Sequence, residues 1–365
     1  MGKSDIFRVT DCPVPSGSGN HHEGLDALLS LMESYGLKFY RASGEAGVGG
    51  KDGLIGRSDV VLVKVNAQWK YRGCTNSDVV RGLIQRVLEH PDGFDGEVIV
   101  FENGQGGGSL ECDTMWGRQY PDKGVHANAE DERHSFSYLV DRVFADSRVS
   151  NYLLDPVREI FISEGDHSTD GYRRLGDVSY PCFTTVKGNR VELKDGIWNG
   201  KGFDGRLKLI NMPVLKHHGG CGVTGALKSY YGVLSMADGN RSMRHYDRLG
   251  VHCGKMVSEV RAPVVSILDC IWVTQVMWAG YPPAYTTRLN QLLASVDPVA
   301  LDYWASKNLL YPIDGNVEHH PDKFDALRNY LVQARDVINS GDGVGGLKVT
   351  LDESNINVHN LKYND

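Results

Sequence analysis

The chain has 365 residues, of which 41% are hydrophobic and 23% are charged, and its formal net charge is −7. Such a chain can bury a large core, and its scattered lysine and arginine residues exclude the basic stripe that nucleic-acid binding requires. No apolar run approaches the roughly 18 to 20 residues that cross a membrane. The seven cysteines include no CxxC pair, which favours free thiols in a reducing compartment. We therefore expect a cytoplasmic globular protein without nucleic-acid or membrane partners.

The first half of the chain predicts a strand, a helix and a second strand. After an amphipathic helix at 24–35, an apolar, β-branched segment at 59–66 indicates a strand buried on both faces. A helix follows, with Thr75 or Ser77 as its N-cap. A strand at 97–102 completes a βαβ unit, in which ligands bind at the carboxyl ends of the strands. The glycine-rich segment after it has neither GxGxxG nor GxxxxGK[ST] spacing, so we interpret it as a flexible turn.

The second half continues the alternation of strands and helices. Asp297 is a natural N-cap, and Pro298 suits the first position of a helix. We expect a polar loop at 109–133, a helix at 134–144, a strand at 159–163, a β-rich stretch at 180–202, strands at 206–212, 263–269 and 291–295, and helices at about 222–234 and 321–338.

This order predicts an α/β fold with a mainly parallel central sheet, helices on both faces and a smaller β-rich insertion. We expect an N-terminal extension with one helix at 1–57 and a C-terminal helix and tail at 311–365. The α/β domain between them spans 58–310, with the insertion at about 103–205.

The segment from Asn211 to Lys228 carries the most chemistry. It leaves a predicted strand, places Lys216 and His217 in a loop rich in glycine, and enters a helix through Thr224. Free N–H groups at the start of a helix bind anions, and two lysines would add positive charge. The segment therefore predicts an anion or substrate site, with a tight turn that has only a structural role as the simpler alternative.

The same loop has a second interpretation as a metal site. Imidazole and thiolate ligands suit zinc or iron, and His217, His218 and Cys221 could form such a set with Cys253. Neither CxxC nor HExxH spacing supports this set. A cysteine near a helix start could also act as a nucleophile or redox thiol, although Cys221 has the alternative role of a small buried residue.

Other candidates follow strand ends. Lys64 and Asn66 end the first strong strand and could face the crevice that holds Lys216, although Lys64 could instead extend from a sheet edge. Asp269 ends another strand and could act as an acid, a base or a cap. Arg241 and Arg244 could clamp a carboxylate or phosphate, or they could lie on a solvated face.

The motifs in these segments are VLVKVN at 61–66 with Thr75 nearby, Lys216-His217, VTGALK at 223–228, YGVL at 231–234, SILD at 266–269 and ASVDPVALD at 294–302. In this order they resemble the family named domain of unknown function 362 (DUF362), over roughly 55–310. The resemblance implies an α/β domain that is joined in some relatives to a ferredoxin-like module with four-iron clusters, and hence an iron–sulfur redox partner. This chain lacks a CxxCxxCxxxCP run, and it has Val65 where relatives commonly have proline.

The leading hypothesis is an enzyme, with a redox link among its alternatives, that binds a small anionic substrate or cofactor. Lys64, Asn66, Lys216 and Lys228 would bind or polarise the anion, His217 would transfer protons, and Asp269 is a second acid or base. The alternatives are a metal- or iron–sulfur-handling protein and a non-catalytic protein that assembles into homo-oligomers.

Overall fold

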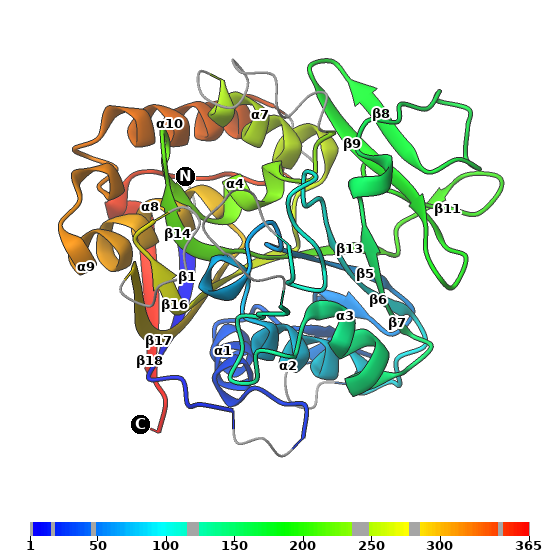
Figure 1. Cartoon of the computed structure of the whole chain (residues 1–365), viewed down its shortest axis with the longest axis horizontal. Helices are drawn as coiled ribbons and strands as arrows, with labels where there is room; N and C mark the ends of the chain where they lie inside the picture. The colour runs from blue at the N-terminus through cyan, green and yellow to red at the C-terminus, as the bar shows by residue number, and fades with distance from the viewer. Residues whose placement is uncertain are drawn as a thin grey trace.

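The computed structural model describes residues 3–15, 19–44, 49–114, 124–235, 248–276, 285–341 and 346–364. A mixed, mostly parallel central sheet runs in the order β18-β1-β17-β16-β13-β5-β6-β7 (Figure 1). Its strands are β1 (Ser4–Thr10), β5 (Val60–Val65), β6 (Glu97–Glu102), β7 (Val149–Leu153), β13 (Leu207–Met212), β16 (Val265–Thr274), β17 (Thr286–Ser295) and β18 (Ile356–Lys362).

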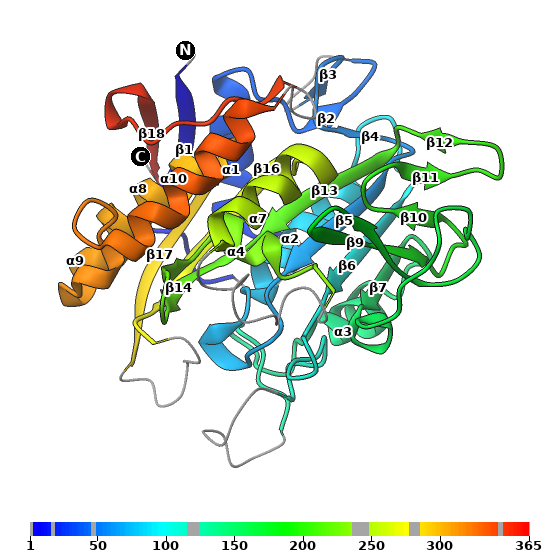
Figure 2. The same cartoon turned by 90° about the horizontal axis from the view of Figure 1, so that it is seen from above.

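The helices form two layers, one on each face of the sheet (Figure 1), and in Figure 2 the second of these layers lies in front of the sheet. The first layer contains α1 (Glu23–Ser34), α2 (Ser77–Leu88) and α3 (Phe136–Tyr138), which continues as η2 (Leu139–Phe144). The second contains α4 (Ala226–Tyr231), α7 (Leu249–Lys255) with η4 (Met256–Val260), α8 (Pro298–Ala305) with η6 (Ser306–Leu310), α9 (Tyr311–Asp314) and α10 (Asp325–Ser340).

Alternation along β5 divides the core between these layers. Val61 and Val63 pack in the cluster that contains the buried residues of α1 and α2, whereas Leu62 packs in the cluster that contains α4 and α10. Successive strand residues point to opposite faces, so both faces of β5 are covered and its unbroken apolar sequence is explained. The sequence prediction of this strand is confirmed.

A second, antiparallel sheet covers part of the α4 face and confirms the expected β-rich insertion. Figure 1 shows it beside the helical layer of that face. It contains β8 (Gly171–Leu175), β9 (Val178–Thr184), β10 (Arg190–Glu192), β11 (Gly196–Trp198) and β12 (Phe203–Asp204). The remaining short elements are β2 (Tyr40–Arg41), β3 (Gly49–Gly50), β4 (Ile55–Gly56), η1 (Tyr71–Gly73), η3 (Asp155–Val157), η7 (Val317–His319) and η9 (Glu353–Asn355).

The loop expected after β13 is a β-hairpin. Beyond Pro213 the chain continues as β14 (Val214–His218), which pairs with the second half of β16, and returns as β15 (Gly222–Thr224). Gly222 has φ +83, and a Cβ there would lie 2.2 Å from the Glu318 carbonyl oxygen, so only glycine fits this return. The predicted helix at 222–234 is therefore shorter and begins at Ala226.

Three other local predictions differ from the structure. The N-cap of α2 is Asn76, whose side chain accepts hydrogen bonds from the next N–H groups, and not Thr75 or Ser77. The strand expected at 159–163 is absent among the described residues there, and β7 joins the sheet instead. The central sheet also gains β1 and β18, which were not predicted; they pair with each other from opposite ends of the chain.

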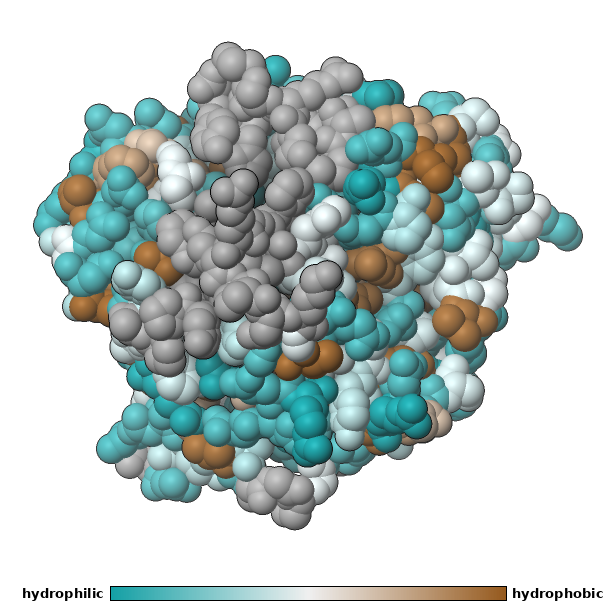
Figure 3. Space-filling model, in the orientation of Figure 1, coloured by the Kyte–Doolittle hydropathy of each residue, from teal (hydrophilic) through white to brown (hydrophobic). Residues whose placement is uncertain are grey.

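Among the described residues, no helix is both long enough and apolar enough to span a membrane. The face drawn in Figure 3 is largely hydrophilic where it is coloured, and its hydrophobic residues gather in small separate patches, several of them over the five-stranded sheet. Scattered patches of this kind are ordinary on a protein surface and indicate no particular partner.

Asp302 joins α8 to the start of α4. Its carboxylate accepts hydrogen bonds from the N–H groups of Ala226, at 2.6 Å, and Leu227, at 3.0 Å, and it is fully buried. A Cβ on Gly225 would lie 2.2 Å from Asp302 Oδ1, which explains the glycine at the N-cap of α4.

Replacing Asp302 with alanine leaves two buried N–H groups without an acceptor. Each unsatisfied group costs about 1–3 kcal/mol, so Asp302→Ala should lower the free energy of unfolding by about 3 kcal/mol in urea denaturation. The control Asp325→Ala removes an exposed carboxylate from the first turn of α10 and should change stability by less than about 0.5 kcal/mol. Equal losses for the two variants would contradict this role for Asp302.

Candidate functional site

Lys64 and Glu102 form a buried ion pair at the carboxyl ends of two neighbouring strands. Lys64 ends β5 and Glu102 ends β6, and their side chains are almost completely buried. The Lys64 ammonium group lies 2.6 Å from Glu102 Oε2 and donates hydrogen bonds to the Val65 carbonyl, at 2.7 Å, and Ser229 Oγ, at 3.2 Å. These contacts occupy Lys64, which is thereby held against α4.

Lys216 projects from β14 into the same region. Its ammonium group donates to the Gly73 carbonyl at 2.6 Å, and the side chain is 3% exposed. Burial lowers the pKa of Lys216 to about 7; Cys74 and Glu102 act in the opposite direction, and the charges of Lys228 and Lys64 lower the pKa further. A lysine with a pKa near neutrality can exchange a proton under physiological conditions.

Lys228 is the third lysine of the group, and it extends from α4. Only 9% of it is exposed, and no hydrogen bond or ion pair reaches its ammonium group within the described part of the chain. Its Nζ lies 5.4 Å from the centroid of the Tyr231 ring, a cation–π contact. Burial lowers the pKa of Lys228, and Lys64 and Glu102 are close enough to shift it as well. We call Lys64, Lys216 and Lys228 the lysine site.

Asn66 and Thr224 surround this site in different ways. Asn66 Oδ1 accepts the Val214 N–H at 2.9 Å, and the Thr75 hydroxyl accepts the Asn66 N–H at 2.8 Å while donating to the Met212 carbonyl at 2.7 Å. Asn66 therefore fastens the end of β5 to the junction of β13 and β14. Thr224 is the cross-strand partner of Lys216 in the hairpin and is buried beside it.

Asp269 satisfies backbone groups instead of facing the lysines. Its carboxylate accepts the N–H groups of Asn76, at 2.7 Å, and Ile271, at 2.9 Å. Burial raises the pKa of Asp269 to about 7, these two hydrogen bonds lower it, and the charge of Arg72 adds a smaller lowering effect. This geometry matches the capping alternative, since the carboxylate organises the start of α2.

His217 belongs to a different cluster from Lys216. Its Nδ1 lies 2.9 Å from His319 Nε2, and His319 Nδ1 lies 3.3 Å from Asp314 Oδ1. His319 is fully buried. Neighbouring residues of a strand point to opposite faces, which explains why Lys216 and His217 have different partners. Burial lowers the pKa of both histidines.

The proposed metal ligands are divided between two surroundings. Cys221 Sγ lies 3.2 Å from His218 Nδ1, whereas His217 contacts His319. Burial raises the pKa of Cys221 to about 11 and raises that of Cys253, so both remain thiols. Among the described residues, no group of three or more histidine, cysteine, aspartate or glutamate side chains is arranged to hold a metal ion.

Two sets of backbone N–H groups, at the start of α4 and in the glycine-rich turn, are occupied by carboxylates of the chain itself. Asp302 occupies the first N–H groups of α4. In the glycine-rich turn, Asp155 accepts the N–H groups of Gly104, at 2.5 Å, and Gly106, at 2.6 Å. These two sets of backbone N–H groups are therefore satisfied within the chain. Arg241 and Arg244 lie outside the described residues.

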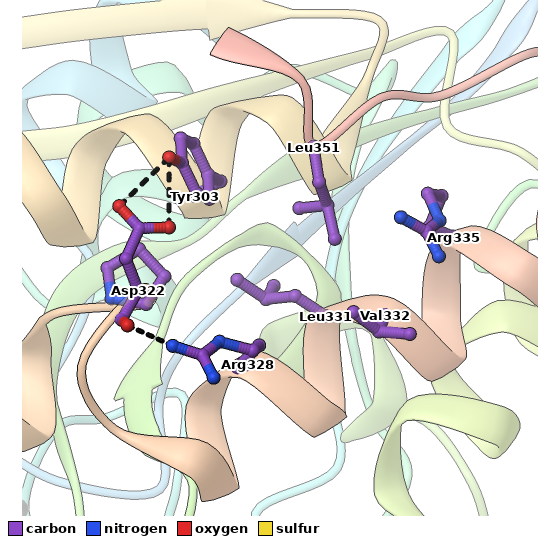
Figure 4. A pocket seen from close by; sticks show the side chains of 8 residues that line it. Tyr303, Asp322, Arg328, Leu331, Val332, Arg335 and Leu351 are labelled. Atoms are coloured by element: carbon purple, nitrogen blue, oxygen red, sulfur yellow. Dashed lines mark hydrogen bonds between the residues drawn. The ribbon is translucent and has the colours of Figure 1, made fainter.

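A separate pocket of about 140 Å³ lies between α8 and α10 (Figure 4). Its charged groups have partners: Tyr303 donates to the Asp322 carboxylate, which also pairs with Lys307, and Arg335 pairs with Asp336. The volume is below the roughly 300–1,000 Å³ of typical small-molecule sites. The pocket offers no unpaired charge comparable with Lys228.

Comparison with known proteins relates part of the chain to a protein family. The model of the family described as Domain of unknown function (DUF362) matches residues 194–307, which is under a third of the chain and contains Lys216 and Lys228 but neither Lys64 nor Glu102. No curated protein and no solved structure matches the chain. The elements from β11 to α8, which supply two of the three lysines of the lysine site, lie in the segment that matches this family model.

Proposed function

We propose that the chain is an enzyme that binds a small substrate through a carboxylate or phosphate group at the lysine site. The observation that carries this proposal is Lys228, a residue that is only 9% exposed and whose ammonium group has no anionic partner among the described residues. Lys228 would bind the anion, and Lys216 would transfer a proton.

The charge balance of the site supports an anionic ligand. The charges of Lys64 and Glu102 affect the pKa values of both Lys216 and Lys228. Glu102 is the ion-pair partner of Lys64. Burying an ammonium group without a partner costs several kcal/mol. Proton loss from Lys216, with its pKa of about 7, relieves part of this cost. A bound anion would relieve the remainder at Lys228.

The reaction class follows from the roles of these two lysines. A group with a pKa near the working pH is an effective general acid or base, and a fixed ammonium group can stabilise negative charge that develops in a transition state. Proton transfer next to a carboxylate or phosphate therefore fits the site. The metal-handling alternative has less support, because its ligands occupy separate surroundings among the described residues.

The proposal predicts opposite stability changes for two lysine substitutions. Lys64→Met leaves Glu102 buried without its partner and should lower the free energy of unfolding by about 3–5 kcal/mol. Lys228→Met removes an unpaired buried charge and should leave stability unchanged or raise it by about 1 kcal/mol. Urea denaturation in anion-free buffer measures both. A large loss of unfolding free energy in Lys228→Met would show that this lysine has a structural partner.

Binding should depend on Lys228 and on the protonation of Lys216. Isothermal titration calorimetry with sulfate, phosphate and oxalate as probes should detect binding by the natural chain and a loss of at least about tenfold in Lys228→Met. The matched control is Lys208→Met, which removes a partly buried lysine from β13. That variant should bind all three probes as the natural chain does.

The pH dependence has a defined sign. Because the pKa of Lys216 is lowered to about 7, this lysine is charged below that pH and neutral above it. Sulfate keeps its charge throughout, so its affinity should fall as the pH rises from about 6 to about 9. The pH-dependent fall in sulfate affinity should be absent in Lys216→Met.

If Lys228→Met and Lys208→Met bound the probes equally, the lysine site would not be the binding site.

A further inference from the structure

Strand β18 forms one end of the central sheet. Its seven residues pair in continuous register with β1, from Ser4 opposite Ile356 to Thr10 opposite Lys362. Figure 1 shows β18 and β7 at opposite ends of the sheet. A strand in this position presents backbone N–H and C=O groups that can pair with a further strand.

The alternation of the backbone decides which groups of β18 point away from β1. The Tyr363 N–H donates to the Thr10 carbonyl at 3.0 Å. Since the backbone groups of successive strand residues point to opposite sides, the residues with odd numbers bond to β1 and those with even numbers point outward. The residues whose backbone groups point outward are Ile356, Val358, Asn360 and Lys362.

These outward groups are open to a partner strand. The Val358 carbonyl accepts the side-chain amide of Asn360 at 3.3 Å, and no other hydrogen bond within the described part of the chain reaches the outward groups. β18 also lacks the features that commonly protect an edge strand. It contains no proline and no shift of register, and its one charged residue, Lys362, is its last.

The strands at the other ends of the sheets are less open. In the five-residue strand β7, the outward N–H of Val149 donates to the Asp146 carbonyl at 2.9 Å. In β8, the Tyr172 N–H donates to the Ile160 carbonyl at 2.7 Å, and the Tyr172 carbonyl accepts the Ile162 N–H at 2.9 Å. The end strands β3, β4 and β12 have two residues each.

We propose that two copies of the chain form a dimer through antiparallel pairing of their β18 strands around a two-fold axis at His359. Such an interface uses the same surface of both copies. The dimer does not depend on the lysine site.

The outward groups select this register. With the axis at His359, Ile356 lies opposite Lys362 of the second copy, and Val358 lies opposite Asn360 of the second copy. Each opposed pair exchanges two N–H···O bonds, which gives about eight hydrogen bonds in the dimer. With the axis at Val358, Lys362 would lie opposite Ser354, which is outside β18. The axis at His359 therefore pairs every outward group.

The charges at the two ends of β18 favour a second copy in the antiparallel direction. Parallel pairing would place the two Lys362 ammonium groups side by side, which is destabilising. Antiparallel pairing brings Lys362 of each copy to the start of the other strand, which follows the exposed carboxylates of Asp352 and Glu353. Within its own chain, Lys362 has only a long contact of 3.9 Å with the exposed Asp11 among the described residues. Charge and hydrogen bonding are thus both complementary between two copies.

The first test measures the mass of the natural chain by sedimentation equilibrium at about 1–100 μM, a range that covers micromolar dissociation constants. We expect a species with twice the mass of the chain, which dissociates on dilution. A monomer throughout this range would overturn the proposal.

The second test removes one outward N–H. Asn360→Pro removes it from each strand, whereas the residues that bond to β1 keep theirs. The dissociation constant of the dimer should rise at least about tenfold, because the N–H groups are lost and the proline ring meets the partner strand. The matched control Asn360→Ala loses the same side chain but keeps the N–H, and it should dimerise as the natural chain does. Equal dissociation constants for the two variants would overturn the assignment to β18.

The third test uses cysteine crosslinking and does not depend on the folding of the proline variant. Across the axis, the Cα atoms of the two His359 residues should lie about 4.5 Å apart, a separation that a disulfide can bridge. His359→Cys should therefore give a dimer on a non-reducing gel after mild oxidation, and reduction should remove it. The natural cysteines that the structure describes are buried, and the natural chain measures their background.

Asn357→Cys is the matched control for the register. Residue 357 lies on the same face of β18 as residue 359. Its two copies are offset by four residues along the strands, so their Cα atoms are about 14 Å apart and cannot form a disulfide. A crosslink in Asn357→Cys as strong as that in His359→Cys would overturn the proposed pairing, as would no crosslink in either variant.

Discussion

Burial of lysine ammonium groups at the carboxyl ends of the parallel strands is the constraint from which the chemistry of this protein follows. The ion pair of Lys64 and Glu102 joins β5, β6 and α4 at one point. That pair uses the carboxylate nearest to the site, so Lys216 and Lys228 must be stabilised in other ways. The Lys216 ammonium group donates a hydrogen bond to the Gly73 carbonyl, and its lowered pKa lets it lose its charge near neutral pH. Lys228 has no anionic partner among the described residues. A protein gains no stability from such a group, which is why we connect it with function.

Other buried carboxylates are used within the chain. Asp302 binds the first N–H groups of α4, and Asp155 binds the glycine-rich turn. Asp269 organises the start of α2 in the same manner. Each of these carboxylates accepts hydrogen bonds from backbone N–H groups to which a ligand could otherwise have bound. These backbone N–H groups already have a carboxylate as a partner, whereas the ammonium group of Lys228 has no anionic partner among the described residues.

Sequence patterns predicted the parts of the fold that depend on local alternation and apolar runs. β5 and β6 were found because both faces are buried, and the cap of α8 was found because Asp297 and Pro298 are adjacent. β1 and β18 were missed because each is stabilised by a partner from the other end of the chain. Lys64, Lys216 and Lys228 were proposed as site residues from strand ends and from the segment at 211–228, and their role stays a prediction. Their unequal pairing and the contact of His217 with His319 depend on long-range packing that no local pattern encodes.

The most direct measurement is the titration of the Lys216 ammonium group by NMR in protein that carries ¹³C-labelled lysine, with assignment by Lys216→Arg. The lysine site predicts a midpoint near pH 7 in the free protein and a higher midpoint when sulfate is added, because a bound anion stabilises the charged form. A midpoint near the ordinary lysine value of about 10.4, unaffected by sulfate, would contradict both the buried setting of Lys216 and its proposed part in anion binding.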